Sequence, residues 1–253
     1  STKHNWAFQG APEPELNGRR FKHDRGKTLG GSSSINGMVF IRGHALDYDG
    51  WQQSGCRGWG YADVLPYFKR MEAYDGGGDT YRGHDGPLRV HRPAAENPIA
   101  AAFLKAGHEA GYPVTDDING FCQEGFGVFD RTISNGERWS TARGYLNPVR
   151  NRPNLTVGTH AQVQNLLFDG HRVTGVRYRS RNGTMATVRA RRETILGGGA
   201  VGTPHILMLS GIGPADHLRA HGIEVVKDLS GVGQNLNDHP DFVLKFRCLQ
   251  PVS

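Results

Sequence analysis

Two adjacent glycines followed by three serines, at residues 30–34, form the stretch of this 253-residue chain whose composition best suits ligand chemistry. Glycine can adopt positive φ and lets the backbone lie close to a ligand, because it has no Cβ. The hydroxyls and backbone N–H groups, at the start of an expected helix, would together bind an anion. With Arg25 and Lys27 just before it, the loop suits a pyrophosphate-bearing cofactor. A serine-rich surface turn explains the same residues, and the loop alone does not decide between the two.

A second glycine-rich stretch, Gly197-x-Gly199-x-x-Gly202, follows an expected strand and precedes an expected helix. This pattern is typical of dinucleotide-binding folds, and acidic residues for a ribose follow it at Glu224 and Asp228. Such a fold needs several further βα units, and too few residues follow to build them. The pattern therefore favours a nicotinamide site only weakly.

Histidines offer two further hypotheses. His217 and His221 are four residues apart on an expected helix, a spacing that can bind zinc, but no third ligand lies nearby in the sequence. Exposed side chains are the better interpretation, and we expect no metal site. His239 could serve as a general base, but we interpret it as structural. No GxSxG motif is present, which disfavours a hydrolase.

Both glycine-rich stretches resemble the two signatures of the glucose–methanol–choline (GMC) flavin oxidoreductases. The first reads Gly26-Lys27-x-Leu29-Gly30-Gly31-Ser32-Ser33-x-Ile35-Asn36, followed by Phe40, Gly43 and Asp49. The second reads Gly199-Ala200-x-x-Thr203-Pro204-x-Ile206-Leu207-x-x-Ser210-Gly211-Ile212-Gly213, followed by the stretch 231–239. The likeness covers the whole chain, and four segments resemble the choline dehydrogenase branch: Asn5–Ala7, Thr115–Gly120, Gln123–Gly127 and Gln250–Ser253.

The resemblance implies an FAD cofactor. Its binding residues would be Arg25, Gly26, Leu29, Gly30, Gly31, Ser32, Asn36, Gly37, Met38, Val39, Val163, Gly198, Gly199 and Ala200. Residues 30–32 would lie along the pyrophosphate and ribityl chain, residues 36–39 beside the isoalloxazine ring, and the Val163 backbone at the adenine. Some relatives attach the flavin through a histidine where this chain has Ile35, so we expect dissociable, non-covalent FAD.

The activity implied by the resemblance is oxidation of a choline-like primary alcohol to the aldehyde. Hydride would pass to flavin N5 and the electrons to an acceptor other than NAD. The catalytic histidine of the family would lie beyond Ser253, so we assign no catalytic residue within this chain. Two alternatives remain open: a non-catalytic fragment or pseudoenzyme, and a GMC-type lyase with a redox-silent flavin. Trp59, Tyr61 and Trp139 could contribute to an aromatic cage for a quaternary ammonium, although core packing is the simpler expectation.

The expected fold is a mixed α/β protein, incomplete at both ends. By resemblance, residues 1–60 and 150–240 belong to an FAD-binding domain built from discontinuous segments, and 61–149 and 241–253 to an inserted substrate domain. Residue patterns predict helices at 61–73 (starting or kinked near Pro66), 97–110, 142–146, 204–210 and 216–220. Their predicted ends are Asn97 as N-cap with Pro98 first and Gly111 just past the end, residues 140–143 as the cap of the third helix, and Thr203 as N-cap with Pro204 first. The patterns predict strands at 155–159, 164–168, 173–181, 184–192 and 223–227, with turns at Asp169-Gly170 and Asn182-Gly183. They also predict a lid-like link at 45–51 and a loop at 76–97.

The formal charge of +6 and pI of about 9.4 raise the possibility of a nucleic-acid or anionic-membrane partner. The densest arginines, at residues 177–192, flank an Asn-Gly turn, and a solvated sheet face explains them best. We therefore expect no nucleic-acid partner and keep peripheral membrane contact as the minority interpretation. Three scattered cysteines and the absence of an apolar run of about 20 residues favour a cytoplasmic protein, with the inner face of a membrane as the alternative.

Overall fold

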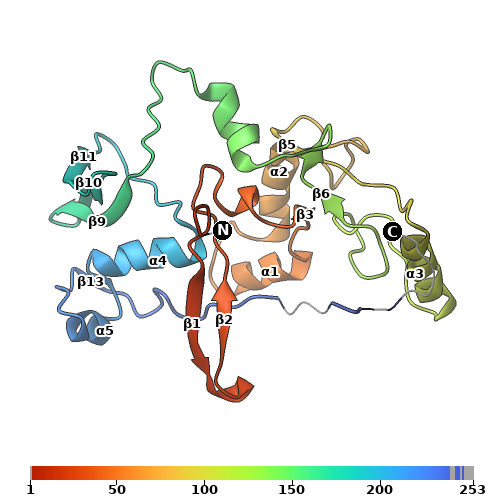
Figure 1. Ribbon diagram of the computed structural model, residues 1–253, viewed down its shortest axis with the longest axis horizontal. Helices are drawn as coiled ribbons and strands as arrows, with labels where there is room; N and C mark the ends of the chain where they lie inside the picture. The colour runs from red at the N-terminus through yellow and green to blue at the C-terminus, as the bar shows by residue number, and fades with distance from the viewer. Residues whose placement is uncertain (1, 240–242, 246, 248–253) are drawn as a thin grey trace. The chain divides into compact units, whose positions relative to one another are not determined.

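The computed structural model describes residues 2–239, 243–245 and 247. It divides the chain into two compact units, Ser1–Leu155 with Arg247–Ser253, and Thr156–Phe246 (Figure 1). Each unit contains both helices and strands, as predicted. No helix within the described ranges has the length and apolar character needed to cross a membrane. Most of the predicted substrate-domain segment 241–253, including the Gln250–Ser253 motif, lies outside the described residues.

The first unit combines short paired strands with three α-helices. Its strands are β1 (Phe8–Glu13), β2 (Arg19–His23), β3 (Val39–Phe40), β4 (Glu72–Tyr74), β5 (Leu88–Val90), β6 (Asp130–Arg131), β7 (Ile133–Ser134) and β8 (Glu137–Arg138). Its helices are α1 (Ala45–Gln53), α2 (Tyr61–Met71) and α3 (Pro98–Glu109), with short turns η1 (Pro14–Leu16), η2 (Gly31–Ser34), η3 (Ala142–Leu146) and η4 (Asn147–Val149). The pairs β1–β2, β3–β6 and β7–β8 are antiparallel, whereas β4–β5 is parallel.

The core of this unit forms where β3 and β5 meet. Phe40, Leu88 and Val90 are buried there, and Met71, Tyr74 and Trp139 pack against them. Because these side chains come from strands, a helix end and a loop, the core holds together segments that are far apart in the sequence.

Helix α3 confirms the strongest local prediction. The Asn97 side chain accepts a hydrogen bond from the Ile99 N–H at 2.9 Å, and Pro98 occupies the first helical position, where its missing N–H costs nothing. Gly111 follows the helix with φ of 82°, a conformation that favours glycine. The helix therefore begins and ends where its capping residues predict.

Two other predictions for this unit are wrong. Residues 45–51 form α1 instead of a link, because His44 and Asp47 make a reciprocal capping box at its start. The expected loop at 76–97 contains β5, which pairs in parallel with β4. Pro66 lies inside α2, and the helix continues past it.

The second unit is a three-stranded antiparallel sheet, in the order β11-β10-β9, packed against a helix (Figure 1). Its elements are β9 (Gln162–Asp169), β10 (Arg172–Arg179), β11 (Met185–Arg189), α4 (Gly199–Leu209), β12 (Ile212–Gly213), α5 (Ala215–Ala220) and β13 (Lys227–Asp228). The predicted turns at Gly170 and Gly183 are confirmed, with positive φ at both glycines. The strand predicted at 155–159 does not form, and the one predicted at 223–227 is reduced to β13.

Helix α4 begins earlier than predicted. It starts at Gly199, with Gly198 as N-cap, so that Pro204 lies inside the helix instead of at its first position. The Ser210 hydroxyl then ties the end of α4 to the sheet, since it donates to the Ile206 carbonyl at 2.6 Å and accepts from the Leu166 N–H at 2.9 Å. The second glycine-rich stretch is thereby joined to β9.

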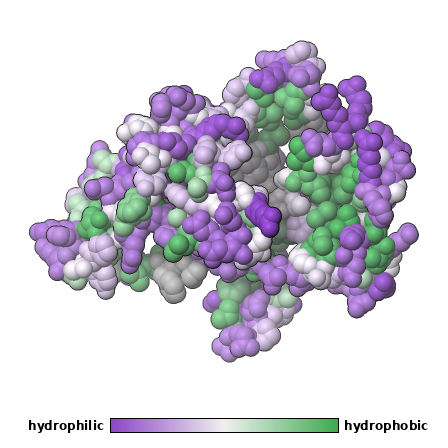
Figure 2. Space-filling model, turned by 180° about the vertical axis from the view of Figure 1, so that it is seen from behind, coloured by the Kyte–Doolittle hydropathy of each residue, from purple (hydrophilic) through white to green (hydrophobic). Residues whose placement is uncertain are grey.

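Hydrophobic side chains reach the surface in several separate areas, shown in green in Figure 2. Phe121 in the first unit is 86% exposed and Ile195 in the second is 83% exposed. The described residues therefore leave apolar surface on each unit that other parts of a protein, or a ligand, can cover.

Candidate functional site

The glycine-serine loop, defined here as residues 26–39, is the first candidate site. Gly30 and Gly31 both adopt positive φ, of 86° and 54°. Gly30 is the N-cap of η2, a single 3-10 turn that begins at Gly31 and is followed by Ile35 as C-cap, where φ is −130°. The predicted helix after the glycines is therefore one short turn, and any anion bound here would be held by loop N–H groups.

The serine hydroxyls hold the loop in shape. The Ser32 hydroxyl accepts from the Gly26 N–H at 3.1 Å, Ser33 donates to the Gly30 carbonyl at 2.6 Å, and Ser34 donates to the Leu29 carbonyl at 2.8 Å. Such local bonds from serine to backbone stabilise irregular turns. The hydroxyls of Ser33 and Ser34 therefore have an internal structural role, and their contact with a ligand stays a prediction.

The glycines of the loop divide into two kinds. A Cβ on Gly26 would lie 2.1 Å from the Gly31 carbonyl oxygen, and one on Gly30 would lie 2.5 Å from the Ser34 hydroxyl. These two glycines are needed for the loop to close on itself. At Gly31 and Gly37 a Cβ would meet nothing within 4 Å. The backbone at these two positions therefore faces open space in which a ligand can approach it.

The end of the loop is a tight turn held from both sides. The Asn36 side-chain oxygen accepts from the Met38 N–H at 3.1 Å, and Met38 has a φ of 65°, an uncommon value for a non-glycine residue. Thr132 donates through its N–H to the Met38 carbonyl at 2.8 Å, and β3 then pairs Val39 with Arg131. These contacts fix the direction of the backbone beside Gly37.

The entrance to the loop is held by the Asn5-Trp6-Ala7 segment. The Asn5 side chain accepts from the Arg25 N–H at 3.0 Å, and the Lys27 ammonium lies 4.6 Å from the centre of the Trp6 ring. This segment, which resembles the choline dehydrogenase branch, anchors the basic residues that precede the glycines.

The loop residues fit a group that is anionic at one end and flat and apolar at the other. Residues 26–39 include no acidic side chain, and Arg25 and Lys27 stand at the entrance. Leu29 and Val39 remain 38% and 44% exposed. Within the described part of the chain, the Gly37 N–H has no hydrogen-bond acceptor. A nucleotide cofactor with a pyrophosphate and an aromatic ring system meets these requirements.

The remaining predicted cofactor residues lie in the second unit. Val163 is half-buried in β9, opposite Tyr178 of β10. Gly198, Gly199 and Ala200 form the start of α4, and Gly199 has a φ of 80° with no atom within 4 Å of the position of a Cβ. Because α4 is bonded to β9, Val163 and the glycine turn at the start of α4 belong to the same unit. The ten predicted residues from Arg25 to Val39 belong to the first unit.

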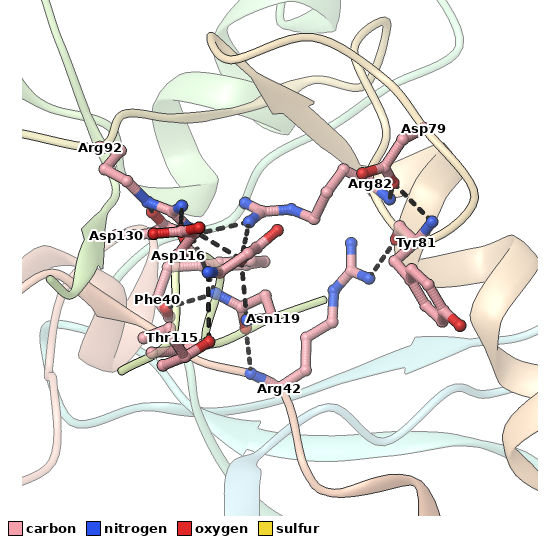
Figure 3. A network of polar contacts seen from close by, with 12 residues as sticks. Phe40, Arg42, Asp79, Tyr81, Arg82, Arg92, Thr115, Asp116, Asn119 and Asp130 are labelled. Carbon is pink, nitrogen blue, oxygen red and sulfur yellow. Dashed lines mark hydrogen bonds and ion pairs between the residues drawn. The ribbon is translucent and has the colours of Figure 1, made fainter. Parts of the chain in front are cut away.

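A buried cluster of charges in the first unit was not predicted from the sequence, and Figure 3 shows part of it. Its members are three arginines and three carboxylates: Arg42, Arg82, Arg92, Glu72, Asp117 and Asp130. Glu72 and Asp130 are fully buried, and Arg82 is 1% exposed. Equal numbers of opposite charges make this burial tolerable.

The pairing within the cluster is dense. Arg82 contacts Glu72 at 2.6 Å, Asp117 at 2.7 Å and Asp130 at 2.9 Å. Arg92 contacts the same two aspartates, at 2.7 Å each. Burial opposes the charged form of Arg82, but its hydrogen bonds to Glu72 and Asp117 raise its pKa above the ordinary value.

Asp117 is the carboxylate of the cluster that is nearest to solvent. Burial opposes its ionisation, but the Asn119 N–H and the guanidinium groups of Arg82 and Arg92 hold its pKa below the ordinary value. For Arg42, desolvation by burial dominates and lowers the pKa in spite of its pairing with Glu72.

Asn119 connects the cluster to β3. Its side-chain oxygen accepts from the Arg42 N–H at 2.7 Å, and its amide donates to the Phe40 carbonyl at 3.2 Å and to Asp130 at 2.9 Å (Figure 3). Asn119 belongs to the Thr115–Gly120 segment that resembles the choline dehydrogenase branch. Polar residues inside an otherwise apolar stretch, such as Arg42 after Val39–Ile41, were the signal that could have indicated this cluster.

A pocket of about 430 Å³ lies beside the cluster. Arg42, His44, Tyr61, Tyr81, Phe121 and Gln123 are among its lining residues. Tyr61, considered above for a cation cage, is thus at a pocket, and desolvation by burial raises its pKa. Trp59 is 54% exposed and stacks edge-on with Trp51, whereas Trp139 packs on the core. Of these three aromatic residues, Tyr61 is the one that lines this pocket.

The histidines considered for chemistry lie at the surface of the second unit. His217 and His221 have ring centres 4.7 Å apart. The described residues contain no group of three or more His, Cys, Asp or Glu side chains arranged to hold a metal ion. His239 is exposed, and its N–H donates to the Asp238 side chain.

Known proteins are similar in sequence to this chain over nearly its whole length. The chain is 52% identical to the oxygen-dependent choline dehydrogenase of Brucella ovis over 250 residues, which cover 99% of this chain and 45% of the relative. The chain thus spans about half the length of the curated relatives that it matches.

Solved structures of other proteins are also similar to this chain. Pyridoxine 4-oxidase from Mesorbium loti has a TM-score of 0.85 and 35% identity, over 90% of this chain and 45% of that one. An FAD-dependent oxidoreductase from Chaetomium thermophilum has a TM-score of 0.88 and 33% identity, over 93% of this chain and 43% of that one. The family model described as GMC oxidoreductase matches residues 8–241, a range that includes both glycine-rich stretches, and the chain therefore belongs to the GMC oxidoreductase family.

Proposed function

We propose that this chain supplies part of the flavin-binding framework of an FAD-dependent dehydrogenase that oxidises a choline-like primary alcohol to its aldehyde. FAD is the cofactor of the GMC family. The observation that carries the proposal is the glycine-serine loop, which is closed by its own hydroxyls and opens at Gly31 and Gly37 onto free space. The 52% identity to a choline dehydrogenase supports the choice of substrate.

The loop residues have distinct parts in this proposal. Gly30, Gly31 and Ser32 would lie along the pyrophosphate and ribityl chain, where basic side chains at Arg25 and Lys27 favour negative charge. Residues Asn36–Val39 would lie beside the isoalloxazine ring, and the Gly37 N–H is a donor for charge that develops on it. Gly26 and Leu29 complete the binding residues of this loop. In the second unit, Val163 would meet the adenine, and Gly198–Ala200 would close over the cofactor.

When bound, FAD supplies a hydride acceptor at N5, and in the proposed reaction the electrons then pass to an acceptor other than NAD. The chain's own contribution is to bind and orient the cofactor and to present N–H donors from the turn at residues 36–38. The exposed apolar side chains at Leu29 and Val39 would exclude water from the face that they cover. Because Ile35 offers no nucleophile for a covalent bond, the cofactor is proposed to be dissociable.

Anaerobic addition of choline to the full-length enzyme tests the proposed reaction. The oxidised flavin absorbance should bleach, and denaturation with acid should release the flavin from the protein. A flavin that keeps its oxidised spectrum would refute the dehydrogenase and favour the lyase with a redox-silent flavin. A full-length protein that retains no flavin after gel filtration would favour a pseudoenzyme.

The domain division is proposed along the same lines. Residues 1–60 and 150–240 would contribute to the FAD-binding domain, and 61–149 and 241–253 to the substrate domain. Limited proteolysis of the full-length enzyme with and without FAD tests this division, since bound FAD should protect sites in 1–60 and 150–240 more than sites in 61–149.

Location in the cytoplasm, with peripheral contact on the inner face of a membrane, is a secondary proposal. The observation that favours contact is the row of arginines on β10. Arg177 and Arg179 lie on one face of this strand and donate to the neutral side chains of Asn165 and Gln162. Cosedimentation with vesicles rich in anionic lipid, compared with neutral vesicles, is the test. Equal, negligible binding to both would reject the membrane contact.

A further inference from the structure

A second segment of the first unit is bonded along the glycine-serine loop. This segment, called the strap here, comprises residues 138–142 and lies more than a hundred residues later in the chain. It runs from the end of β8 into η3. The sequence predicts that Ser140 and Thr141 cap the helix that follows. Ser140 does so, but Thr141 makes no cap hydrogen bond and turns to the loop instead.

Arg138 holds the far end of the loop. Its Nη1 donates to the Asn36 side-chain oxygen at 2.8 Å and to the Ser33 carbonyl at 3.2 Å. The same Asn36 oxygen accepts the Met38 N–H. One guanidinium therefore supports the acceptor that maintains the left-handed Met38 and, with it, the direction of the Gly37 backbone.

Thr141 and Ala142 hold the near end. The Thr141 N–H donates to the Ser33 hydroxyl at 2.9 Å, and the Thr141 hydroxyl donates to the Gly30 carbonyl at 3.2 Å. A Cβ on Gly30 would lie 3.2 Å from the Ala142 methyl group. Glycine is thus required at position 30 partly because the strap lies so close to it.

A third link runs through the backbone. The Trp139 N–H donates to the Thr132 carbonyl at 2.8 Å, and the Thr132 N–H donates to the Met38 carbonyl at 2.8 Å. Trp139 itself packs on the core, and its indole N–H donates to the Pro87 carbonyl at 2.8 Å. The strap is therefore anchored in the interior and transmits that rigidity to the loop.

We propose that Arg138 and Thr141 are positioning residues for FAD: they hold residues 30–38 in the conformation that receives the cofactor. The proposal rests on the proposed function for its ligand, but the geometry belongs to this chain alone. A loop that contains four glycines and a non-glycine residue at positive φ loses much conformational entropy when a ligand orders it. Strap contacts made before binding remove part of that cost.

The test uses the full-length enzyme, purified with FAD and then stripped to the apoprotein. The variants are Arg138→Met, which removes every donor, Arg138→Lys, which keeps a charge and one donor group, and Thr141→Val, which removes only the hydroxyl. Arg150→Met is the matched control, because Arg150 is an exposed arginine of the same unit. The readouts are amide hydrogen exchange of residues 31–38 in the apoprotein, FAD affinity by titration, and the midpoint potential of the bound flavin.

For Arg138→Met we expect faster exchange at residues 31–38 and FAD affinity reduced by about tenfold, the equivalent of one hydrogen bond from a charged donor. The midpoint potential should shift as well, since the Gly37 N–H moves. Arg138→Lys should restore part of each change, Thr141→Val should weaken FAD binding several-fold, and Arg150→Met should match the wild type.

The proposal would be overturned if Arg138→Met had the same amide hydrogen exchange, FAD affinity and flavin midpoint potential as the wild type. Should that variant fail to fold, Thr141→Val decides through the same exchange and affinity measurements, and wild-type values there would overturn it. If the wild-type enzyme binds no FAD, the proposed function fails, whereas the exchange measurement on the apoprotein still decides whether the strap orders the loop.

Discussion

Replacing Glu72 by glutamine tests the energetic role of the buried charge cluster. Glu72 is fully buried and accepts hydrogen bonds from Arg42 Nη2, from Arg82 Nε at 3.0 Å and Nη2 at 2.6 Å, and from the Gly83 N–H at 3.1 Å. Glutamine keeps the shape of the side chain, removes its charge and turns one acceptor oxygen into an amide donor. That donor would face guanidinium N–H groups that cannot accept a hydrogen bond.

The magnitude follows from the charge balance. Three arginines face three carboxylates in the cluster, so the substitution leaves one cation without a counter-charge. Removing one partner of a buried ion pair costs about 3–5 kcal/mol. Glu137 pairs with Arg143 at the surface, where solvent screens the charges. The control Glu137→Gln should therefore cost less than about 1 kcal/mol.

Tryptophan fluorescence during urea unfolding is the appropriate assay. All four tryptophans, at positions 6, 51, 59 and 139, lie in the first unit together with the cluster. The signal therefore follows the unfolding of that unit. Glu72→Gln should lower the free energy of unfolding by about 3–5 kcal/mol, with little change in the dependence on urea.

A double variant separates charge balance from lost packing. Arg42→Met alone leaves an excess negative charge, whereas Arg42→Met with Glu72→Gln restores two arginines against two carboxylates. The double variant should be less destabilised than the sum of the single ones, by about 0.5–3 kcal/mol. Strict additivity, or a cost for Glu72→Gln below about 1 kcal/mol, would refute the reasoning that the cluster is held by compensated buried charge.

Three further results are expected. Asn119→Ala leaves the buried Arg42 N–H without its acceptor and should lower the free energy of unfolding in urea by about 1–3 kcal/mol. Gly30→Ala should destabilise the first unit, because the new Cβ would clash with neighbouring atoms. Gly31→Ala places its Cβ in open space, so backbone strain should lower the free energy of unfolding in urea by only about 1 kcal/mol. The same variant of the full-length enzyme should bind FAD more weakly in a titration. Because the pKa of Asp117 is lowered by folding, its charge stabilises the protein above its ordinary value of 3.8, and this stabilisation is lost as the pH falls through the lower folded pKa. Urea titrations should therefore show wild type losing more stability than Asp117→Asn below about pH 3.8; equal losses would contradict this.

Local patterns were sufficient where one segment carries its own signals. Helix α3 is predicted because Asn97, Pro98 and Gly111 act on residues next to them. The turns at Gly170 and Gly183 are predicted for the same reason, since each joins two adjacent strands. In both cases the interactions that form the element lie within a few residues.

Local patterns gave wrong predictions where contacts with a distant segment, and not contacts with adjacent residues, determined the structure. Thr141 resembles a helix cap, but its hydroxyl donates to the Gly30 carbonyl. The sequence predicts a loop where β5 forms, because its partner β4 precedes it by more than ten residues and supplies the hydrogen bonds. Propensity is a weak guide when tertiary contacts compete with it.

Residue types and spacing alone placed this chain in its family and indicated both glycine-rich stretches, since a signature of that kind depends on short-range backbone geometry. Only the tertiary structure shows which glycines are needed to close the loop and which face free space. It also shows that the hydroxyls of Ser32, Ser33 and Ser34 form hydrogen bonds within the loop. Folding also assembled six charged residues, spread from Arg42 to Asp130, into one buried cluster. Such groupings depend on contacts between distant segments, and these arise only when the chain packs around a common core.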